Sequence, residues 1–156
     1  MRKAILFVSM LILLTGCAAK PADNETFVFQ VEGHDLEIGE KATQLLADIG
    51  NPLDQYTSPS CAFEGEDTVY DYGSYQITTY LSSGTEIFTG FYLIDASIST
   101  KEGIHIGSSF DQVISAYGDG YTEEYGVYTY TLGLTDLSFV IVEDTVTSIS
   151  YLHIVD

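Results

Sequence analysis

Two cysteines and three histidines are the residues of this 156-residue chain best suited to nucleophilic or metal chemistry. A catalytic thiol needs a histidine or another cation that stabilises its thiolate. The residues next to Cys61 are apolar or acidic and offer no such group. We therefore expect Cys61 to be buried and inert, as free cysteines commonly are. A disulfide between two molecules and a thiol-based enzyme that uses Cys61 stay open as alternatives.

The histidines give no sign of a metal site, because the spacing of His34, His105 and His153 matches no ligand motif. The chain also lacks the Gly-x-Ser-x-Gly, Ser-x-x-Lys, His-Glu-x-x-His, Cys-x-x-Cys and phosphate-loop signatures of common enzymes. An active site normally combines a base, a nucleophile and a positive or metal group. We therefore expect no metal, no cofactor and no enzymatic activity.

Acidic residues gather beside glycine in two expected loops, residues 64–67 and 119–124. Calcium binds in such oxygen-rich turns, and extracellular calcium sites of low affinity are common. Neither run has the alternating ligand order of an EF-hand loop. We expect solvated acidic loops, with a calcium-dependent surface protein as the alternative.

The amino-terminal residues carry a different chemistry. A basic pair precedes an apolar stretch, residues 4–14, that is too short for a permanent membrane span. The run Leu14-Thr15-Gly16-Cys17 then resembles the lipobox of bacterial lipoprotein signal peptides. The resemblance implies that residues 1–16 are removed and that the Cys17 thiol is lipidated. With residues 17–26 as a tether, the protein would be anchored to the cell membrane on its outer, extracytoplasmic face.

The charge of the chain narrows its partners. Five Lys or Arg stand against 23 Asp or Glu, which gives a formal net charge of −18. Two of the five basic residues, Arg2 and Lys3, fall in the expected leader. Nucleic acid and anionic lipid surfaces are disfavoured as partners, because no basic patch is present to neutralise phosphates. A hydrophobic content of 46% disfavours a disordered chain.

One pattern occurs twice, 68 positions apart. Ile38-Gly39 and Ile106-Gly107 are each followed by apolar residues at i, i+3, i+4 and i+7, which is typical of one helix face. A glycine ends each pattern, as is common after the last helical turn. In the second copy we expect Ser108 to cap the helix, with Asp111 at position N3. The pattern predicts two short helices and indicates a duplication.

Runs rich in Tyr, Thr, Val, Ile and Phe follow each helix. They predict strands at residues 68–72, 75–81 and 87–94, then at 125–132, 137–142 and 146–154, and an extra strand at 27–31. Residues 51–65 form the longest connection without a pattern. We predict an α+β fold in which two tandem helix-plus-antiparallel-meander repeats form one sheet with both helices on one face. The repeats would be residues 27–99 and 100–156 of one compact domain.

This arrangement resembles the beta-lactamase inhibitory protein, and a single unit resembles the small outer-membrane lipoproteins of the SmpA/OmlA type. The runs Ser60-Cys61-Ala62-Phe63-Glu64-Gly65 and Thr100-Lys101-Glu102-Gly103-Ile104-His105-Ile106-Gly107 are similar to uncharacterised lipoproteins of Gram-positive bacteria. The resemblance covers residues 27–154 and implies this fold with a concave binding sheet. It does not extend to inhibition of beta-lactamase, because no contact residue can be matched.

Tyrosines occur at period two on two corresponding strands, at Tyr70 and Tyr72 and at Tyr128 and Tyr130. Tyrosine presents a large area and a polar tip, which suits a recognition surface. The same four rings could instead form the core under the helices. We predict a membrane-anchored extracytoplasmic lipoprotein that acts as a non-catalytic protein-binding module. These four tyrosines are its candidate binding surface, and its protein partner is unidentified.

Overall fold

The structure is a computed structural model that describes residues 25–62 and 65–154. Cys17, the expected lipidation site, and most of the tether lie outside the described residues. Strand accounts for 52% of the described residues and helix for 12%, with two helices. The prediction of an α+β fold built from two helix-plus-meander repeats is therefore wrong. The chain is mainly β and contains an eight-stranded antiparallel sheet and a separate two-stranded sheet.

The two-stranded sheet is a hairpin of β1 (Val28–Val31) and β2 (His34–Glu37). Its turn, Glu32-Gly33, has positive φ at both residues, which is the geometry of a tight two-residue hairpin turn. The strand β2 was not predicted, because its sequence is mostly polar. The helix α1 (Ala42–Ile49) follows directly and contacts β6 and β2.

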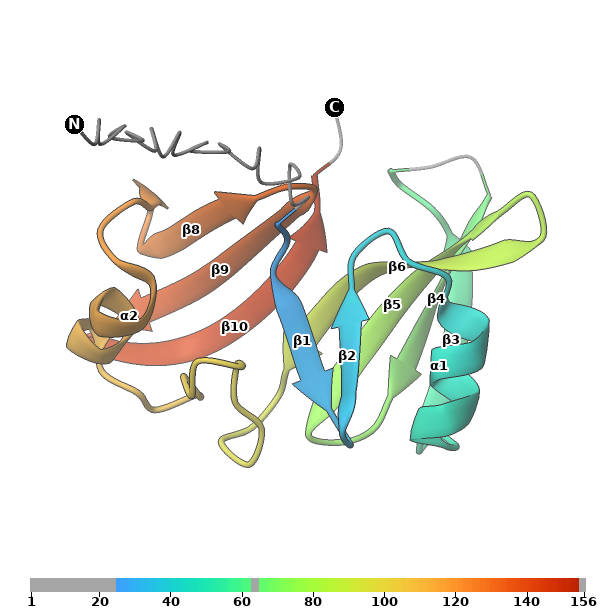
Figure 1. The fold of residues 1–156 in the computed structure, drawn as a ribbon, viewed down its shortest axis with the longest axis horizontal. Helices are drawn as coiled ribbons and strands as arrows, with labels where there is room; N and C mark the ends of the chain where they lie inside the picture. The colour runs from blue at the N-terminus through green and yellow to red at the C-terminus, as the bar shows by residue number, and fades with distance from the viewer. Residues whose placement is uncertain (1–24, 63–64, 155–156) are drawn as a thin grey trace, which may run out of the picture.

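The eight strands of the large sheet are ordered β3-β4-β5-β6-β10-β9-β8-β7, and every neighbouring pair is antiparallel (Figure 1). The helix α2 (Phe110–Tyr117) lies between β6 and β7 in the sequence. The strands are β3 (Asp54–Pro59), β4 (Glu66–Asp71), β5 (Tyr75–Ser82), β6 (Thr85–Leu93), β7 (Thr122–Glu124), β8 (Val127–Leu132), β9 (Thr135–Val142) and β10 (Thr145–His153).

The two central strands, β6 and β10, have the same irregularity. In the pairing of β5 with β6, Thr78 and Thr79 lie opposite Gly90 and Phe88, so that β6 has one extra residue. In the pairing of β10 with β9 the register shifts between Val146 and Ser148, so that β10 has one extra residue. A β-bulge of this kind inserts one residue and breaks the two-residue alternation of side chains. As a result Phe88 and Phe91 are both buried although they are three positions apart, and so are Val146 and Ile149.

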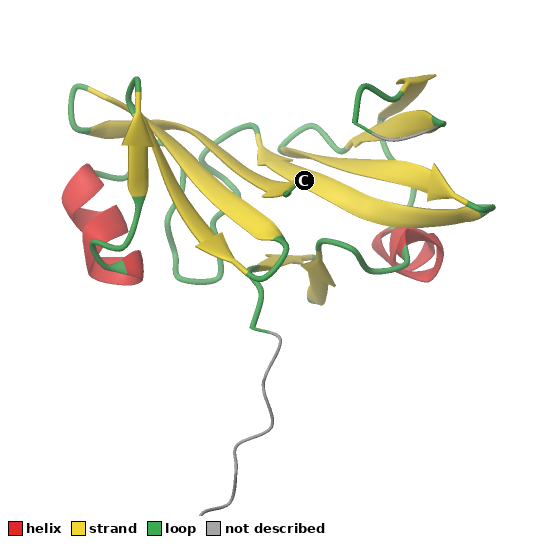
Figure 2. Cartoon of the chain, turned by 90° about the horizontal axis from the view of Figure 1, so that it is seen from above, coloured by secondary structure: helices red, strands yellow, loops and turns green. Residues whose placement is uncertain are grey.

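One face of the large sheet carries the core. Both helices lie on this side of the sheet, and the β1–β2 hairpin lies in front of it (Figures 1 and 2). Phe29 of the hairpin is fully buried and packs its ring against those of Tyr75, Phe91 and Tyr151. Tyr117 of α2 packs in the same way on rings of β8 and β9. We call this the covered face and the opposite side the open face.

The α2 helix begins one residue later than its expected cap. Ser109 is the N-cap, and its hydroxyl accepts a hydrogen bond from the Gln112 amide while the Gln112 side chain accepts one from Ser109. This is a capping box, and position N3 is Gln112 rather than Asp111. Ser108 is buried instead, and its hydroxyl accepts a hydrogen bond from the His105 amide at 3.1 Å. The α1 helix has no side-chain cap at Lys41.

Candidate functional site

The open face has room for a ligand in two hollows. Its strands place short polar side chains in rows, because these residues alternate with the buried residues of the covered face. One row crosses neighbouring strands from Val69 to Thr78, Gly90 and Leu152, which are paired in register. Next along it comes Asp136, the partner of Leu152.

A hollow of about 310 Å³ lies over this row. We call it the Tyr92 hollow, and it is lined by Ser58, Ala62, Asp67, Val69, Thr78, Thr89, Tyr92, Leu152 and His153. Gly90 lies between these side chains. A Cβ atom on Gly90 would be 2.5 Å from Thr78 Oγ1 and 3.3 Å from both Tyr92 Cε2 and Leu152 Cδ2. The Tyr92 ring therefore leans over Gly90, and only glycine leaves the space that the ring and Leu152 occupy.

The carboxylate of Asp67 differs from the other polar groups of this hollow in its hydrogen bonding. Its Oδ1 atom is buried and has no hydrogen-bond partner among the residues that the structure describes. Buried polar atoms are nearly always paired, so this oxygen lacks a donor that would stabilise it. Asp71, on the same strand, accepts hydrogen bonds from the Gly73 amide at 2.7 Å and from Gln76 at 3.0 Å. Those bonds lower the pKa of Asp71.

The pKa of the Tyr92 hydroxyl shows which groups lie near it in the hollow. Its ring is partly buried, and burial is the main reason that the pKa of its hydroxyl is raised. Tyr56 on the edge strand β3 and the Asp67 carboxylate raise this pKa further. The Asp67 carboxylate, which also lines the hollow, is therefore close enough to act on the Tyr92 hydroxyl.

A second hollow, of about 500 Å³, lies over β7, β8 and β9. We call it the Thr129 hollow, and it is lined by Thr122, Glu124, Tyr125, Val127, Thr129, Thr131 and Asp136. Three of its polar side chains take part in hydrogen bonds between side chains. Asp136 accepts a hydrogen bond from Thr131 Oγ1 at 2.5 Å, and the hydroxyls of Thr129 and Ser138 are 2.9 Å apart. The Asp136 carboxylate, unlike that of Asp67, thus already has a side-chain donor.

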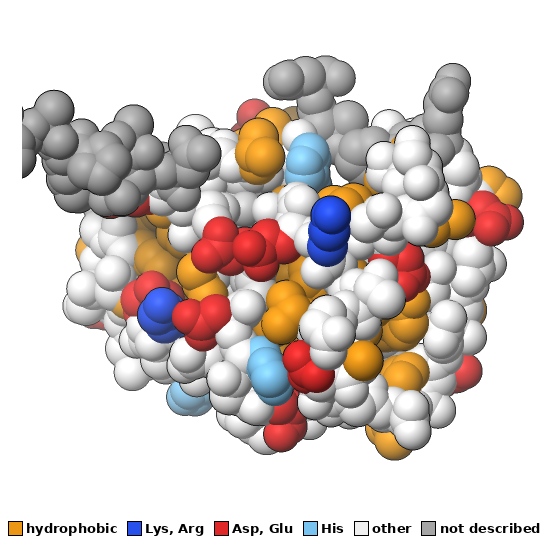
Figure 3. Space-filling view, turned by 45° about the vertical axis from the view of Figure 1, so that its right-hand side comes forward, with side chains coloured by type: hydrophobic (Ala, Val, Ile, Leu, Met, Phe, Trp, Pro, Cys, Tyr) orange, Lys and Arg blue, Asp and Glu red, His pale blue; other side chains and the backbone are white. Residues whose placement is uncertain are grey.

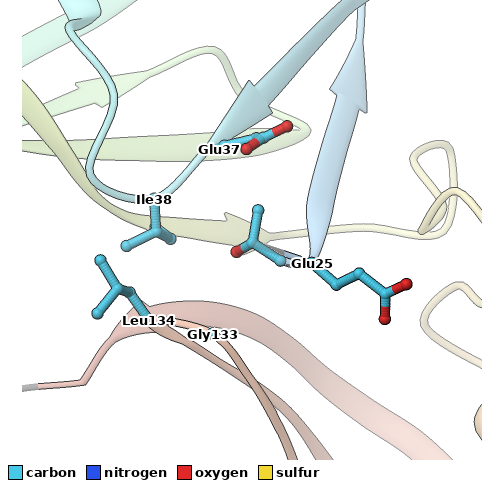
Figure 4. Close-up of a pocket in the computed structure, with 6 residues that line it drawn as sticks. Glu25, Glu37, Ile38, Gly133 and Leu134 are labelled. Atoms are coloured by element: carbon cyan, nitrogen blue, oxygen red, sulfur yellow. The ribbon is translucent and has the colours of Figure 1, made fainter. Parts of the chain in front are cut away.

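A third hollow, of about 470 Å³, lies where the end of β2 meets the turn between β8 and β9. Figure 4 shows Ile38 and Leu134 facing each other across it, with the carboxylates of Glu25 and Glu37 pointing away from that pair. The described chain begins at Glu25, on the wall of this hollow.

The four tyrosines expected at the binding surface lie on the covered side. Tyr70 and Tyr130 are 9% and 5% exposed. Tyr130 donates a hydrogen bond to the carbonyl of Gly118 at 2.8 Å, and Tyr72 donates one to the carbonyl of Gly50 at 3.3 Å. These carbonyls belong to the glycines that end α2 and α1.

The other two of these tyrosines are also tied to core-side groups. The Tyr70 hydroxyl donates to Glu86 at 2.5 Å, and the half-buried Tyr128 ring packs on Phe110. The structure thus keeps the two tyrosine pairs apart, because four strands lie between β4 and β8. Tyr72 and Tyr130 each bond to the end of one helix. The residues of the Tyr92 hollow were not among the expected ones.

Cys61 is a free and exposed cysteine, so the expectation that it is buried is wrong. It lies in the segment after β3 that also contributes Ala62 to the rim of the Tyr92 hollow. Within the described ranges no group of three His, Cys, Asp or Glu is placed to hold a metal ion. The ring nitrogen Nδ1 of His105 lies 2.9 Å from the carbonyl of Ile106.

Basic side chains are scarce around both hollows of the open face. Of the residues that the structure describes, only Lys41 and Lys101 are lysine or arginine, and neither lines the Tyr92 or Thr129 hollow. Lys101 lies 3.8 Å from Asp35 of the hairpin. Figure 3 shows acidic side chains spread in several groups over the side that it displays, with lysines among them.

Comparisons with known proteins give no relative: no family model, no curated protein and no solved structure matches the chain. In the described part of the chain, none of the helices combines the length and the apolar character that crossing a membrane requires.

Proposed function

We propose that the chain is an extracytoplasmic lipoprotein that acts as a non-catalytic protein-binding module through the open face. The observation that carries this proposal is the unequal use of the two sheet faces. The covered face holds the core, whereas the open face keeps two hollows of about 310 and 500 Å³. Concave surfaces with a few convergent polar groups are where ligands most often bind.

The edge of the sheet is a poorer candidate than its face. An exposed edge strand can pair with an extended peptide through its free amides. In β3 the Gln55 amide donates to its neighbour Asp54 at 2.8 Å, and Pro59 has no amide hydrogen. At the other edge β7 is only three residues long. Both features weaken pairing with a partner strand, so a partner is expected to contact the face.

The anchor of this module is part of the proposal. Lipid on Cys17 would hold the chain at the outer face of the cell membrane, since acylation combined with a second signal gives stable attachment. A Cys17→Ser variant expressed in cells is expected to leave the membrane fraction and appear in the soluble fraction. Retention of this variant on membranes would contradict the lipid anchor.

Site-specific photocrosslinking on intact cells tests the binding face. A photoreactive residue at Ser148, exposed on β10 of the open face, is expected to capture one defined protein. The matched control is the same residue at Ala47, exposed on α1 at the other side of the sheet. Equal capture from both positions, or capture from neither, would refute the open face as the binding surface.

A further inference from the structure

We propose that the Tyr92 hollow binds the ammonium group of a lysine side chain presented by the partner protein. This inference rests on the proposed function and deepens it, because it assigns one recognition pocket and the chemistry of the group that enters it.

The shape of the hollow fits an alkyl chain that ends in a polar group. Val69 and Leu152 lie in one row with Thr78 and Gly90 between them, and both line the hollow. The methylene groups of a lysine can pack on such apolar walls while its charged end reaches a polar group. The hollow of about 310 Å³ is at the lower end of the range for small-molecule pockets, which suits one side chain rather than a large ligand.

The charge of the hollow selects a cation with hydrogen-bond donors. Within the described ranges Asp67 Oδ1 is buried and unpartnered, and Asp67 lines the hollow, so this oxygen can accept a hydrogen bond from a group that enters it. An ammonium group carries three donors and a positive charge, and bonds between ionised partners are the strong ones. An anion is disfavoured, because the Asp67 carboxylate lines the hollow and neither described lysine does, which leaves His153 as the one imidazole in its wall.

The aromatic wall favours the same ligand. The Tyr92 ring lies close to Gly90 and lines the hollow together with Asp67. A cation placed over the face of a tyrosine ring gains about 0.5–2 kcal/mol, depending on how far it is desolvated. A carboxylate beside an aromatic face is a combination that recognises an alkylammonium better than a neutral group of the same shape.

The Thr129 hollow gives an internal control, because it is larger and also holds a carboxylate. That carboxylate, Asp136, already accepts a hydrogen bond from Thr131, and no aromatic ring other than the fully exposed Tyr125 lines the hollow. We therefore expect lysine recognition at the Tyr92 hollow alone. The two hollows can be tested within one molecule.

The test is a titration of the full chain, held in detergent micelles, followed by amide NMR. The ligand is N-acetyl-lysine N-methylamide, and the reference ligand is N-acetyl-norleucine N-methylamide, which has the same chain without the ammonium group. The lysine probe is expected to shift the amide signals of Gly90, Tyr92 and Leu152 with an affinity of about 1–10 mM, as expected for one small side chain. The norleucine probe is expected to bind at least about tenfold more weakly.

Matched variants assign the effect to its residues. Asp67→Asn is expected to weaken the lysine probe about tenfold or more, because a charged hydrogen bond is lost. Tyr92→Leu is expected to weaken it about threefold to fivefold. Asp136→Asn should leave the titration unchanged. The free spectra show whether each variant is folded.

Three outcomes would overturn the lysine assignment. They are equal binding of both probes, an Asp67→Asn variant that binds like the native chain, and a choline probe that binds more tightly than the lysine probe. Each would leave the proposed function standing if crosslinking at Ser148 still captures one protein and Ala47 does not. Failure of the crosslinking with a positive lysine titration would remove the proposed function and keep the pocket.

Discussion

The two faces of the large sheet are made of the same strands but use different chemistry. On the covered face, aromatic rings of α2 and of the strands β1, β5, β6, β8, β9 and β10 pack against one another, and most of them are buried. On the open face, threonine and serine hydroxyls pair across strands, as Thr89 does with Thr78 and Thr129 with Ser138. The covered face therefore supplies the hydrophobic stability of the fold. The open face is left free to vary without unfolding the chain.

Gly90 and Asp67 differ from the other residues of the open face, because neither adds to the hydroxyl pairs that cross its strands. A side chain on Gly90 would fill the space beside Thr78, and a donor near Asp67 would pair its buried oxygen. A sheet face that served only to meet water needs neither feature. The predictions below test whether stability belongs to the covered face and recognition to the open face, beginning with the largest expected effect.

Alkaline pH is expected to destabilise the covered face more than any single substitution. Burial raises the pKa of Tyr75 to about 12, and it also raises the pKa values of Tyr70, Tyr117 and Tyr151. The folded state thus favours neutral phenols. Stability should be complete below about pH 10, where the unfolded tyrosines are also neutral, and should fall as the pH rises toward 12.

Urea unfolding measured near pH 8 and at several values above about pH 10 checks this prediction. In the Tyr75→Phe variant the loss between those values should be smaller, because one buried phenol is removed. Tyr125→Phe, which changes a fully exposed ring, is the control. A native chain whose stability stays constant up to pH 12 would contradict the prediction.

Truncation of one buried ring on the covered side is expected to have the next largest effect. Phe29→Ala should lower the free energy of unfolding by about 3–5 kcal/mol, since the ring is fully buried against three others. Tyr56→Ala removes a ring that is 54% exposed on β3 and should change it by about 0.5 kcal/mol or less. Urea or thermal unfolding measures both changes. Similar losses of unfolding free energy in the two variants would contradict the view that the covered face alone supplies the hydrophobic stability.

The sequence predicted the elements of the covered face better than the fold that joins them. Apolar spacing of three and four placed helices at 42–49 and 110–117, and β-rich runs placed six strands of the large sheet. The strands β3 and β7 were missed, because all their residues are exposed and leave no alternating pattern. Missing these edge strands and β2 gave too little strand and the wrong fold class.

The bulges explain another part of what pattern reading could not give. Phe88 and Phe91, like Val146 and Ile149, are spaced by three, which fits a helix face better than a strand. Only the register with the neighbouring strands shows that an extra residue turns both side chains inward. This spacing within a β-rich run is the signal that would have indicated a bulge at each site.

The candidate site was even less visible in the sequence. Asp67 belongs to an acidic run that was expected to be solvated, and Tyr92 was not singled out. The available signal was Gly90 in the interior of a strand, since glycine there often marks the close approach of another group. What the sequence cannot give is the register that places Val69, Gly90 and Leu152 in one row.

Filling the Tyr92 hollow is expected to affect recognition more than stability. Gly90→Ala places a methyl group 2.5 Å from Thr78 Oγ1, so that hydroxyl must move, at a cost of about 1–3 kcal/mol. The same methyl group lies 3.3 Å from Tyr92 Cε2, so the ring must shift slightly, and binding of the lysine probe should weaken. Ser138→Ala, on the open face outside the hollow, is the control for both measurements. Undiminished probe binding in a folded Gly90→Ala variant would contradict this account of the hollow.

The smallest expected effect is the difference between two hydroxyl–hydroxyl hydrogen bonds, one on each face of the sheet. The hydroxyls of Thr129 and Ser138 are 2.9 Å apart on the open face, and those of Thr26 and Thr135 are 2.9 Å apart, with Thr135 fully buried. Water competes less at the buried pair, so double-mutant cycles to alanine should give a coupling near 1 kcal/mol there and about 0.2–0.5 kcal/mol on the open face. Denaturant unfolding of the single and double variants measures both couplings. Equal couplings would mean that the hydroxyl pairs of the open face stabilise the fold as much as the buried pair does. The open face would then contribute to stability and would not be reserved for recognition.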